Sequence, residues 1–311
     1  MALHGNHPRQ AEASYRALKL LDGSRLLCYN VRMAKLLTRN QEIERSIITT
    51  YRKTLWSPFA LAVKKYGLIQ AGDKIAVCIS GGKDSMLLAK LMQELQRHGE
   101  APFELVFLAM DPGYNEENRK KIEENASILE LPLTIFESDI FETSEALAGQ
   151  SPCYLCARMR RGHLYAKAKE LGCNKIALGH HKSDVIETTL MAMLYGAQIQ
   201  GMLPRIPSAN FEGMELIRPM YCILERDIIK WKEYNNLDFI ACACSFTEGI
   251  ERRGGELFSA RARVKALIEE LRAENEHVEN NIFQSIHNVQ LDTLAEYKQD
   301  GKKKSFLDKF D

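Results

Sequence analysis

Short apolar runs alternate with stretches of helical periodicity along most of the chain, from about residue 73 onward. Helices are expected where apolar side chains recur at helical spacing, as at Leu87, Leu91 and Leu95. Strands are expected at 74–79, 105–110, 133–136, 175–178 and 215–217, and helices over 86–95, 122–129, 158–171, 184–195 and 226–234. Such alternation implies right-handed crossovers and a parallel sheet with helices on both faces. The pattern predicts a doubly wound, Rossmann-like α/β core over residues 55–245.

The two flanks of this core carry a different pattern, which predicts helices without strands. Helical stretches are expected over 10–66, 255–275 and 279–297, and the charged tail from residue 300 is expected to fray. We therefore divide the chain into three parts: a helical, basic N-terminal segment, an α/β domain and a helical C-terminal extension. These parts cover residues 1–66, 67–250 and 251–311.

The composition is that of an ordinary globular protein. The chain has 311 residues, of which 45% are hydrophobic and 27% are charged. No run of 18 apolar residues occurs, and the polar N-terminus lacks the apolar stretch of a secretion signal, so we expect a cytoplasmic protein without a membrane span. Eight cysteines are too few for a disulfide scaffold in a chain of this length, and reduced thiols are expected.

The net charge of +1 does not by itself indicate a nucleic-acid partner. Its distribution is uneven, because residues 1–53 hold ten Lys and Arg against four Asp and Glu. A local excess of this kind fits a surface that faces a polyanion, but a solvated helical face is the commoner explanation.

The segment Ser80-Gly-Gly-Lys-Asp-Ser85 lies between the first predicted strand and a helix. Two consecutive glycines allow positive φ and a close approach of the backbone to a ligand. The helix start offers free N–H groups and the positive end of its dipole to an anion. Lys83 adds a cation, whereas Asp84 would repel phosphate and is expected to bind Mg²⁺ or to organise the loop. The combination predicts a phosphate site without the GxxxxGK[ST] spacing of a Walker P-loop.

This hexapeptide matches the SGGxDS signature and resembles the PP-loop family, the N-type ATP pyrophosphatases. The resemblance implies an adenine nucleotide alpha hydrolase-like fold that binds ATP, cleaves it between the α- and β-phosphates and adenylates an oxygen of the substrate. It assigns ATP binding to Ser80, Gly81, Gly82, Lys83, Asp84, Ser85 and Gly179.

Cys153-Tyr-Leu-Cys156 has the spacing that lets two thiolates reach one metal ion, although redox pairs and inert thiols share this spacing. Three arginines follow at 158, 160 and 161, where they would lower the thiol pKa values and could hold phosphate groups. A CAC segment comes later, at 242–244. Three thiolates on one metal would leave a coordination position open for chemistry. Ligand spacing alone does not separate iron from zinc.

Five segments together resemble one PP-loop branch, the tRNA 2-thiolation enzymes, and above all the tRNA 2-thiocytidine synthetases (TtcA-like). They are CISGGKDS at 78–85, CYLCARMRRG at 153–162, KIALGHHKSDVIETTLMAMLYG at 175–196, IRPMYCILERDI at 217–228 and CAC at 242–244. The resemblance implies a three-cysteine [4Fe–4S] cluster, ATP with Mg²⁺, and a cysteine desulfurase or other sulfide donor. It also implies a homodimer and, as substrate, cytidine 32 of tRNA.

The cluster ligands that the resemblance assigns are Cys153, Cys156 and one cysteine of the CAC segment. The family's later pair is usually CxxC, and the CxC spacing here leaves the third ligand open. Aligning Arg252 with a family arginine eight residues beyond the ligand favours Cys244, whereas an alignment without gaps from residue 217 favours Cys242. We adopt Cys244, with Cys242 as the alternative.

A second departure from the family lies in its GHHxDD motif, which reads GHHKSD here. Ser183 replaces the first carboxylate of the motif, and Asp184 keeps the second. The change weakens any role that depends on a pair of carboxylates at this point.

The function predicted from these segments is ATP-dependent tRNA thiolation. The pyrimidine C2 oxygen would be adenylated with loss of pyrophosphate, and sulfur would then replace it with loss of AMP. Asp84 and Asp184 are expected to organise Mg²⁺, and Lys83 and Arg161 to stabilise the developing charge. The basic N-terminal segment would contact tRNA phosphates, which position the RNA without specifying its sequence.

Three alternative functions stay open at the level of sequence. The chain could be a PP-loop ligase or amidating enzyme that works without sulfur. It could be a cluster-bearing relative that acts on a small molecule, or a non-catalytic, metal-containing RNA-binding module.

Overall fold

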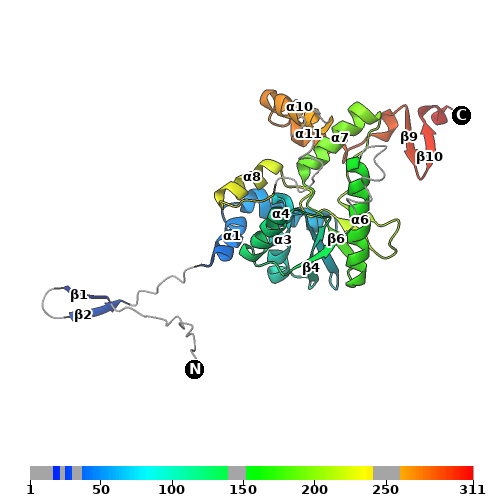
Figure 1. The fold of residues 1–311 in the computed structure, drawn as a ribbon. Helices are drawn as coiled ribbons and strands as arrows, with labels where there is room; N and C mark the ends of the chain where they lie inside the picture. The colour runs from blue at the N-terminus through cyan, green and yellow to red at the C-terminus, as the bar shows by residue number, and fades with distance from the viewer. Residues whose placement is uncertain (1–16, 22–24, 30–36, 139–151, 241–259, 311) are drawn as a thin grey trace, which may run out of the picture. The chain divides into compact units, whose positions relative to one another are not determined.

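The computed structural model describes residues 17–21, 25–29, 37–138, 152–240 and 260–310, and the chain divides into two compact units, Met1–Arg39 and Asn40–Asp311. In the first unit, strands β1 (Ala17–Leu21) and β2 (Arg25–Tyr29) form an antiparallel hairpin (Figure 1). The helix predicted over 10–66 is therefore wrong at these strands. Leucine-rich runs satisfy either periodicity, and the Asp-Gly pair that separates these two runs favours a hairpin.

The second unit is built around a six-stranded sheet. Its strands are β3 (Lys74–Ile79), β4 (Glu104–Asp111), β5 (Leu133–Glu137), β6 (Lys175–Ala177), β7 (Arg205–Pro207) and β8 (Glu215–Ile217). Their order is β5-β4-β3-β6-β8-β7, and every neighbouring pair is parallel except β7 with β8. The structure confirms the doubly wound α/β core and all five predicted strands. The short antiparallel edge strand β7 was not predicted, because three residues ending in proline show no alternation.

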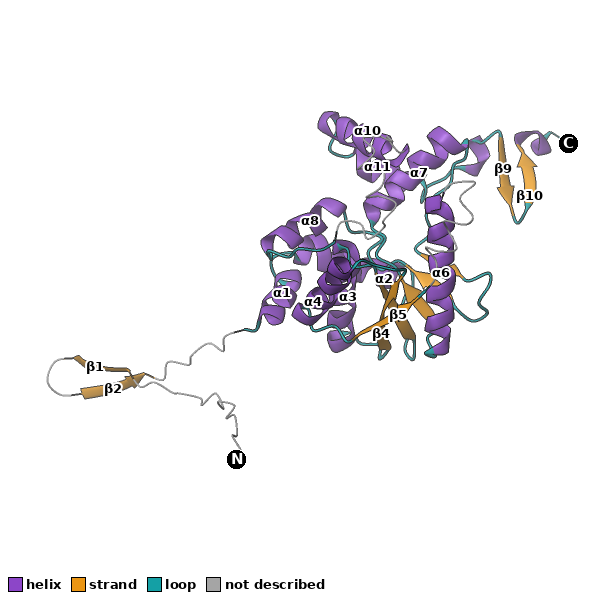
Figure 2. Cartoon of the chain, in the orientation of Figure 1, coloured by secondary structure: helices purple, strands orange, loops and turns teal. Residues whose placement is uncertain are grey.

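Helices cover both faces of this sheet (Figure 2). The described helices are α1 (Arg39–Ile48), a π-helical turn (Arg52–Trp56), α2 (Ser57–Lys65), α3 (Lys83–His98), α4 (Glu116–Ile128), α6 (Pro152–Glu170), α7 (Lys182–Gly196), α8 (Glu225–Tyr234), α10 (Ala260–Glu274) and α11 (Val278–Ser285). Successive residues of β3 face opposite cores. Val77 packs into the larger core with α3, whereas Ala76 and Cys78 pack with Tyr165 of α6. The strand is therefore buried on both sides, as its continuous apolar run predicted.

A third apolar cluster joins α7 to the C-terminal helices. Val185 of α7 packs with Val264 of α10 and Phe283 of α11, and Tyr221 completes the cluster. This packing places the start of α10 close to the start of α7, which becomes important in the site below.

The C-terminal end differs from its predicted form. The helix predicted over 279–297 ends at Ser285, and strands β9 (Glu296–Gln299) and β10 (Lys302–Ser305) pair as a hairpin, followed by a 3-10 turn (Phe306–Lys309). Asp300 and Gly301 both have positive φ, the conformation that a two-residue hairpin loop requires. The prediction of a fraying tail is wrong here, because the Asp300-Gly301 turn was overlooked.

The proposed division of the chain at residues 66 and 250 stays a prediction.

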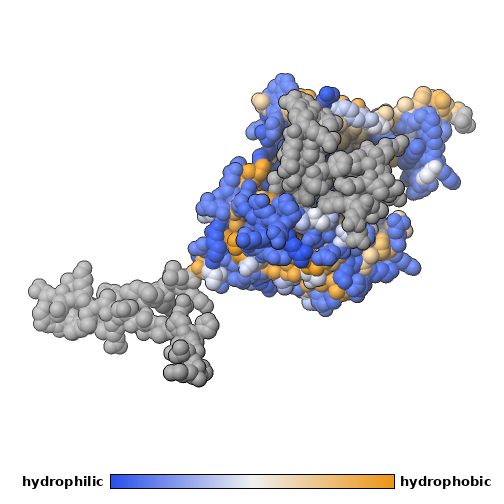
Figure 3. Space-filling view, viewed as in Figure 1, coloured by the Kyte–Doolittle hydropathy of each residue, from blue (hydrophilic) through white to orange (hydrophobic). Residues whose placement is uncertain are grey.

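Figure 3 shows hydrophilic residues over much of the described surface on this side of the chain. None of the helices within the described ranges is both long and apolar enough to cross a membrane.

A buried ion pair fixes the amino ends of β3 and β6, the two strands at the centre of the sheet. Lys175 Nζ donates to Asp73 Oδ2 at 2.6 Å and to the Leu68 carbonyl at 3.0 Å. Asn174 links the same strands, because its amide donates to Asp73 and its carbonyl oxygen accepts from the Lys74 N–H. Burial alone would raise the pKa of Asp73, but the hydrogen bonds from Lys175 and Asn174 lower it.

Replacing Asp73 by alanine is expected to lower the free energy of unfolding by about 3 kcal/mol, because the buried Lys175 ammonium loses its closest carboxylate. The matched control is Glu104→Ala, which removes a 74%-exposed partner of Lys74 and should change stability by less than about 0.5 kcal/mol. Since the folded-state pKa of Asp73 is lowered, its contribution is present above the ordinary carboxyl pKa and is lost as the pH falls through the folded value. Urea unfolding at several pH values measures both effects; equal losses in the two variants would contradict the assignment.

Candidate active site

The order of strands reverses between β3 and β6. From β3 the chain adds β4 and β5 on one side and then places β6 on the other side of β3. In doubly wound sheets, ligands bind at the carboxyl ends of the strands at such a switch point. A cavity of about 370 Å³ lies here. Its lining includes five residues that the sequence assigned to the site: Ser80, Asp84, Ser85, Gly179 and Asp184.

Internal hydrogen bonds hold the loop after β3 in shape. The Ser85 hydroxyl accepts from the Ser80 N–H at 3.1 Å and donates to the Gly82 carbonyl at 2.9 Å. Gly81 has a φ of +83°, and a Cβ there would lie 2.5 Å from Ile240 Cδ1. Glycine is therefore required at 81 both by the backbone conformation and by the neighbouring side chain.

The first turn of α3 is available to a ligand. Gly82 stands at its N-cap position and has no side chain with which to cap it, whereas Asn115 caps α4 and His181 caps α7. The loop after β6 comes close to this turn, since a Cβ on Gly179 would lie 3.1 Å from the Ser85 nitrogen. Uncapped N–H groups at a helix start, beside a closely approaching glycine, form a site suited to phosphate.

Asp84 keeps one carboxylate oxygen without a hydrogen bond. Lys83 Nζ donates to Oδ2 at 3.2 Å, whereas the buried Oδ1 accepts no hydrogen bond from the described residues and lies 3.8 Å from His181 Nε2. Burial raises the pKa of Asp84, and the nearby charges of His181 and Lys83 offset this only in part. A buried acceptor of this kind fits a cation ligand, which would restore the ionised form.

His181 lies between two carboxylates. The backbone N–H of Asp184 donates to His181 Nδ1 at 3.3 Å, and the backbone N–H of His181 donates to Asp184 Oδ2 at 3.0 Å. The two bonds form a reciprocal cap at the start of α7. Because Nδ1 accepts the hydrogen bond from Asp184, the ring presents its Nε2–H toward Asp84. The structure thus brings Asp84 and Asp184 into one site, with an imidazole between them.

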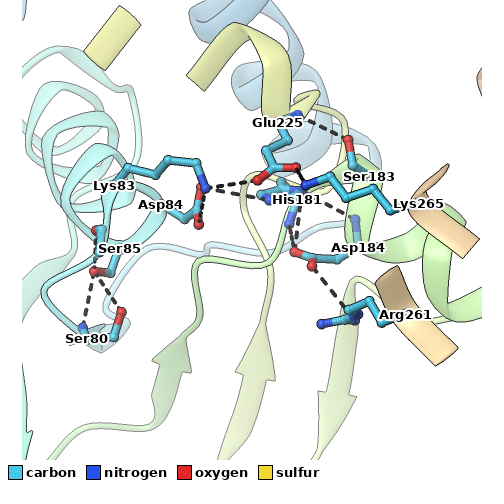
Figure 4. A network of polar contacts seen from close by, with 11 residues as sticks. Ser80, Lys83, Asp84, Ser85, His181, Ser183, Asp184, Glu225, Arg261 and Lys265 are labelled. Carbon is cyan, nitrogen blue, oxygen red and sulfur yellow. Dashed lines mark hydrogen bonds and ion pairs between the residues drawn. The ribbon is translucent and has the colours of Figure 1, made fainter. Parts of the chain in front are cut away.

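Glu225 is a site residue that the sequence reasoning missed. Its carboxylate accepts from Lys83 Nζ at 3.0 Å and from Lys265 Nζ at 2.6 Å, and its N–H donates to the Ser183 hydroxyl at 3.1 Å (Figure 4). Burial works against its ionisation, but the hydrogen bonds from Lys265 and Lys83 lower the pKa of Glu225 to about 2. The segment that contains it, at 217–228, had been used for the resemblance without a role for this glutamate.

Two more cations come from α10, outside the predicted ATP-binding domain. Arg261 lines the cavity, with Nε 3.2 Å from Glu187 Oε2 and Nη2 3.9 Å from Asp184 Oδ1. Lys265 lies one helical turn later. No local motif marks these two residues, because only the packing of α10 on α7 brings them to the site.

His180 lines the cavity, and the buried Arg218 acts on it through its charge. Burial, helped by the charge of Arg218, lowers the pKa of His180 to about 4, so this imidazole in the cavity wall is neutral at pH 7. Burial and the charge of Arg161 lower the pKa of Arg218 to about 10. Arg161, predicted to be catalytic, is exposed on α6 and is not among the residues that line the cavity.

The predicted cluster ligands cannot be placed by their side chains. Cys153 and Cys156 lie in α6, with side chains outside the described set, and Cys242 and Cys244 lie outside the described residues altogether. The part of the chain that the structure describes contains no group of three or more His, Cys, Asp or Glu side chains able to hold a metal ion.

Comparison with known proteins gives a family for this arrangement. The PP-loop domain family matches residues 53–252. The chain belongs to the PP-loop family. A tRNA-cytidine(32) 2-sulfurtransferase of Neisseria meningitidis is 37% identical over 219 residues, which cover 68% of this chain and 66% of that protein. A Geobacter sulfurreducens protein of the same name is 36% identical over 235 residues, covering 74% and 87% of the two chains.

This PP-loop chain thus spans about two thirds (66%) of the Neisseria relative. Among solved structures, the U34-tRNA thiolase NcsA from Methanococcus maripaludis, with its [4Fe-4S] cluster, shares the fold. Its TM-score is 0.58 at 18% sequence identity, covering 75% of this chain and 79% of that one.

In this PP-loop site, Gly81→Ala is expected to weaken ATP binding about tenfold and to lower the free energy of unfolding by about 2 kcal/mol, because the added Cβ is strained and meets Ile240. Gly162→Ala is the matched control. Its Cβ would enter open space within α6, so stability should rise by about 0.5–1 kcal/mol without a change in ATP affinity. Equilibrium dialysis and urea unfolding measure these effects, and unchanged ATP affinity in the Gly81 variant would refute the role of the loop.

Asp84→Asn is expected to stabilise the nucleotide-free protein while abolishing ATP turnover. Since burial raises the pKa of Asp84, the ionised carboxylate is disfavoured at pH 7, and the neutral amide should raise the melting temperature by about 2 °C. The gain in melting temperature should be complete above the pKa that Asp84 has in the folded protein. It should vanish at acidic pH, where the Asp84 carboxyl of the wild-type chain is itself protonated. Thermal melts at pH 4 and pH 8, with an assay of AMP formation, test both parts; lower stability at pH 8 or retained turnover would contradict them.

Proposed function

We propose that this PP-loop protein is an ATP-dependent tRNA 2-sulfurtransferase that acts on cytidine 32. The observation that carries the proposal is the SGGKDS loop at the β3/β6 switch point, together with relatives of that name at 36–37% identity. The site itself contributes an uncapped helix start, the half-buried Asp84 with one oxygen that accepts no hydrogen bond from the described residues, and cations from several segments.

The cavity fits ATP. The first turn of α3 and the Lys83 ammonium would receive the phosphates, and the glycines at 81 and 179 allow the loop and the turn after β6 to pack closely around this helix start. The buried Oδ1 of Asp84 is the acceptor that a Mg²⁺ ion would need, and Asp184 lies nearby across His181.

The chain's residues would then prepare the C2 oxygen of the target base for sulfur. The C2 oxygen attacks the α-phosphate, the bond to pyrophosphate breaks, and Lys83 and the loop N–H groups stabilise the charge that develops on the phosphates. Adenylation converts a poor leaving group into AMP. The target base would first have to leave its stack, a step that costs less in an anticodon loop than in a duplex.

The described residues around the cysteines are compatible with a [4Fe–4S] cluster at this cavity. Helix α6, which contains Cys153 and Cys156, lines the cavity with Leu164. Ile240, two residues before Cys242, packs against the Gly81 position. Both cysteine segments therefore start from elements that border the site. When bound by three thiolates, such a cluster supplies one iron that is free to hold sulfur.

The remaining expected partners belong to the same proposal. A cysteine desulfurase or other sulfide donor would supply the sulfur, tRNA would be the substrate, and a homodimer is the assembly that the family resemblance suggests.

The decisive experiment combines metal analysis with a thiolation assay. Protein purified without oxygen should contain about four irons per chain with matching acid-labile sulfide. With ATP, sulfide and tRNA, it should form 2-thiocytidine at position 32, detected by mass spectrometry of digested tRNA. Cys153→Ala should lose iron and thiolation but still bind ATP, whereas Cys222→Ala, at a half-buried cysteine of another apolar cluster, should keep all three.

Other outcomes would redirect the proposal. Zinc without sulfide, together with ATP-to-AMP turnover, would contradict thiolation and favour a PP-loop ligase that works without sulfur. A full cluster in the Cys153 variant would remove this residue from the ligand set.

A further inference from the structure

Glu225 lies between two ammonium groups that come from segments far apart in the sequence. Its Oε1 is 3.0 Å from Nζ of Lys83 in the phosphate loop, and its Oε2 is 2.6 Å from Nζ of Lys265 in α10. The glutamate side chain is only 18% exposed, compared with 46% for Lys265. Each carboxylate oxygen therefore holds one cation, and the carboxylate fixes the spacing between the two.

The backbone of Glu225 is itself anchored. It is the first residue of α8, and its N–H donates to the Ser183 hydroxyl at the start of α7. The carboxylate also lies in the first turn of α8, where the helix dipole favours a negative charge. With a pKa near 2, Glu225 stays ionised at any working pH, so the two lysines face a permanent anion.

Lys83 shares its charge between two carboxylates, Asp84 at 3.2 Å and Glu225 at 3.0 Å. Burial alone would lower the pKa of Lys83, but these two carboxylates raise it, so the ammonium stays charged. An incoming triphosphate must therefore compete with Glu225 for this cation. The same contact holds the Lys83 side chain in one conformation, so less side-chain entropy is left to lose when a phosphate binds.

We propose that Glu225 is a positioning residue, which holds Lys83 and Lys265 as a pair of cations beside the triphosphate. Glu225 thereby weakens ATP binding but orients the two lysines for the reaction. The inference rests on the proposed ATP-dependent function and extends it to a helix, α10, that lies outside the matched PP-loop segment. Lys265 is then the second cation that Glu225 holds, and it comes from α10, where it lines a neighbouring cavity together with Ser183 and Glu225.

Glu225→Gln distinguishes this role from a merely structural one. The amide keeps the shape and one acceptor but loses the negative charge, so the protein should bind ATP about fivefold more tightly. Pyrophosphate release with tRNA should fall at least about tenfold, because the lysines are no longer held in the productive geometry. A structural role alone would not tighten binding while slowing turnover.

The binding measurement should use ATP with the cluster-free chain, by equilibrium dialysis at low salt, and turnover should be measured separately on the loaded enzyme. The matched control is Glu269→Gln, which removes one negative charge from a second cavity, lined by Ser183, Glu225 and Lys265, without touching Lys83. Its ATP affinity should change less than twofold, roughly the effect of a distant exposed charge.

Glu225→Asp provides a second test that does not depend on the Gln variant being stable. Aspartate keeps the charge but is one methylene shorter, so it cannot hold both lysines, and turnover should fall with little change in ATP affinity.

Unchanged or weaker ATP binding by a folded Glu225→Gln protein would overturn the proposal, as would full turnover by Glu225→Asp. If the wild-type chain itself failed to bind ATP, the proposed function would fail, and this result is distinct from a failure of the positioning role.

Discussion

The amino end of α3 is the feature on which the rest of the site depends. A helix that follows a parallel strand presents unpaired N–H groups and a positive dipole end, and here no side chain caps them because Gly82 occupies the N-cap position. The site becomes a pocket only because β6 pairs directly with β3 and brings Gly179 against the first turn of α3. Strand order and a helix terminus together create the phosphate site, and Lys83, Asp84 and Asp184 are arranged around it.

The two ends of the β3–β6 pair treat buried charge in opposite ways. At the amino end, Asp73 and Lys175 pair closely with each other and with Asn174, an arrangement that serves stability. At the carboxyl end, Asp84 is half-buried, and its buried Oδ1 accepts no hydrogen bond from the described residues; burial raises the pKa of this carboxyl. This difference is expected where one end supports the fold and the other is prepared for a ligand.

The departure at Ser183 is easier to understand in the folded chain than in the motif. The Ser183 hydroxyl accepts the N–H of Glu225 at the start of α8, and Glu225 brings a carboxylate of its own into the site. Without an acid at 183, Lys83 still lies beside the carboxylates of Asp84 and Glu225. His181 lies beside the carboxylates of Asp84 and Asp184. Neighbouring helices can supply charges that a linear motif does not show, and this is why a single substitution in the motif does not argue against catalysis.

The sequence by itself determined the α/β core, the position of the phosphate loop and the family, because these depend on local periodicity and on contiguous residues with specific chemistry. It misjudged β1–β2 and the C-terminal hairpin, where leucine-rich or charged runs fit a helix as well as a strand and only an Asp-Gly pair in the sequence marked the difference. Only the tertiary structure decided that Glu225, Arg261 and Lys265 belong to the site. Glu225 contacts Lys83 of the phosphate loop, Arg261 contacts Asp184, and Lys265 contacts Glu225. These contacts form because α7 and α10 pack together over a long sequence separation, which no periodicity along the chain encodes.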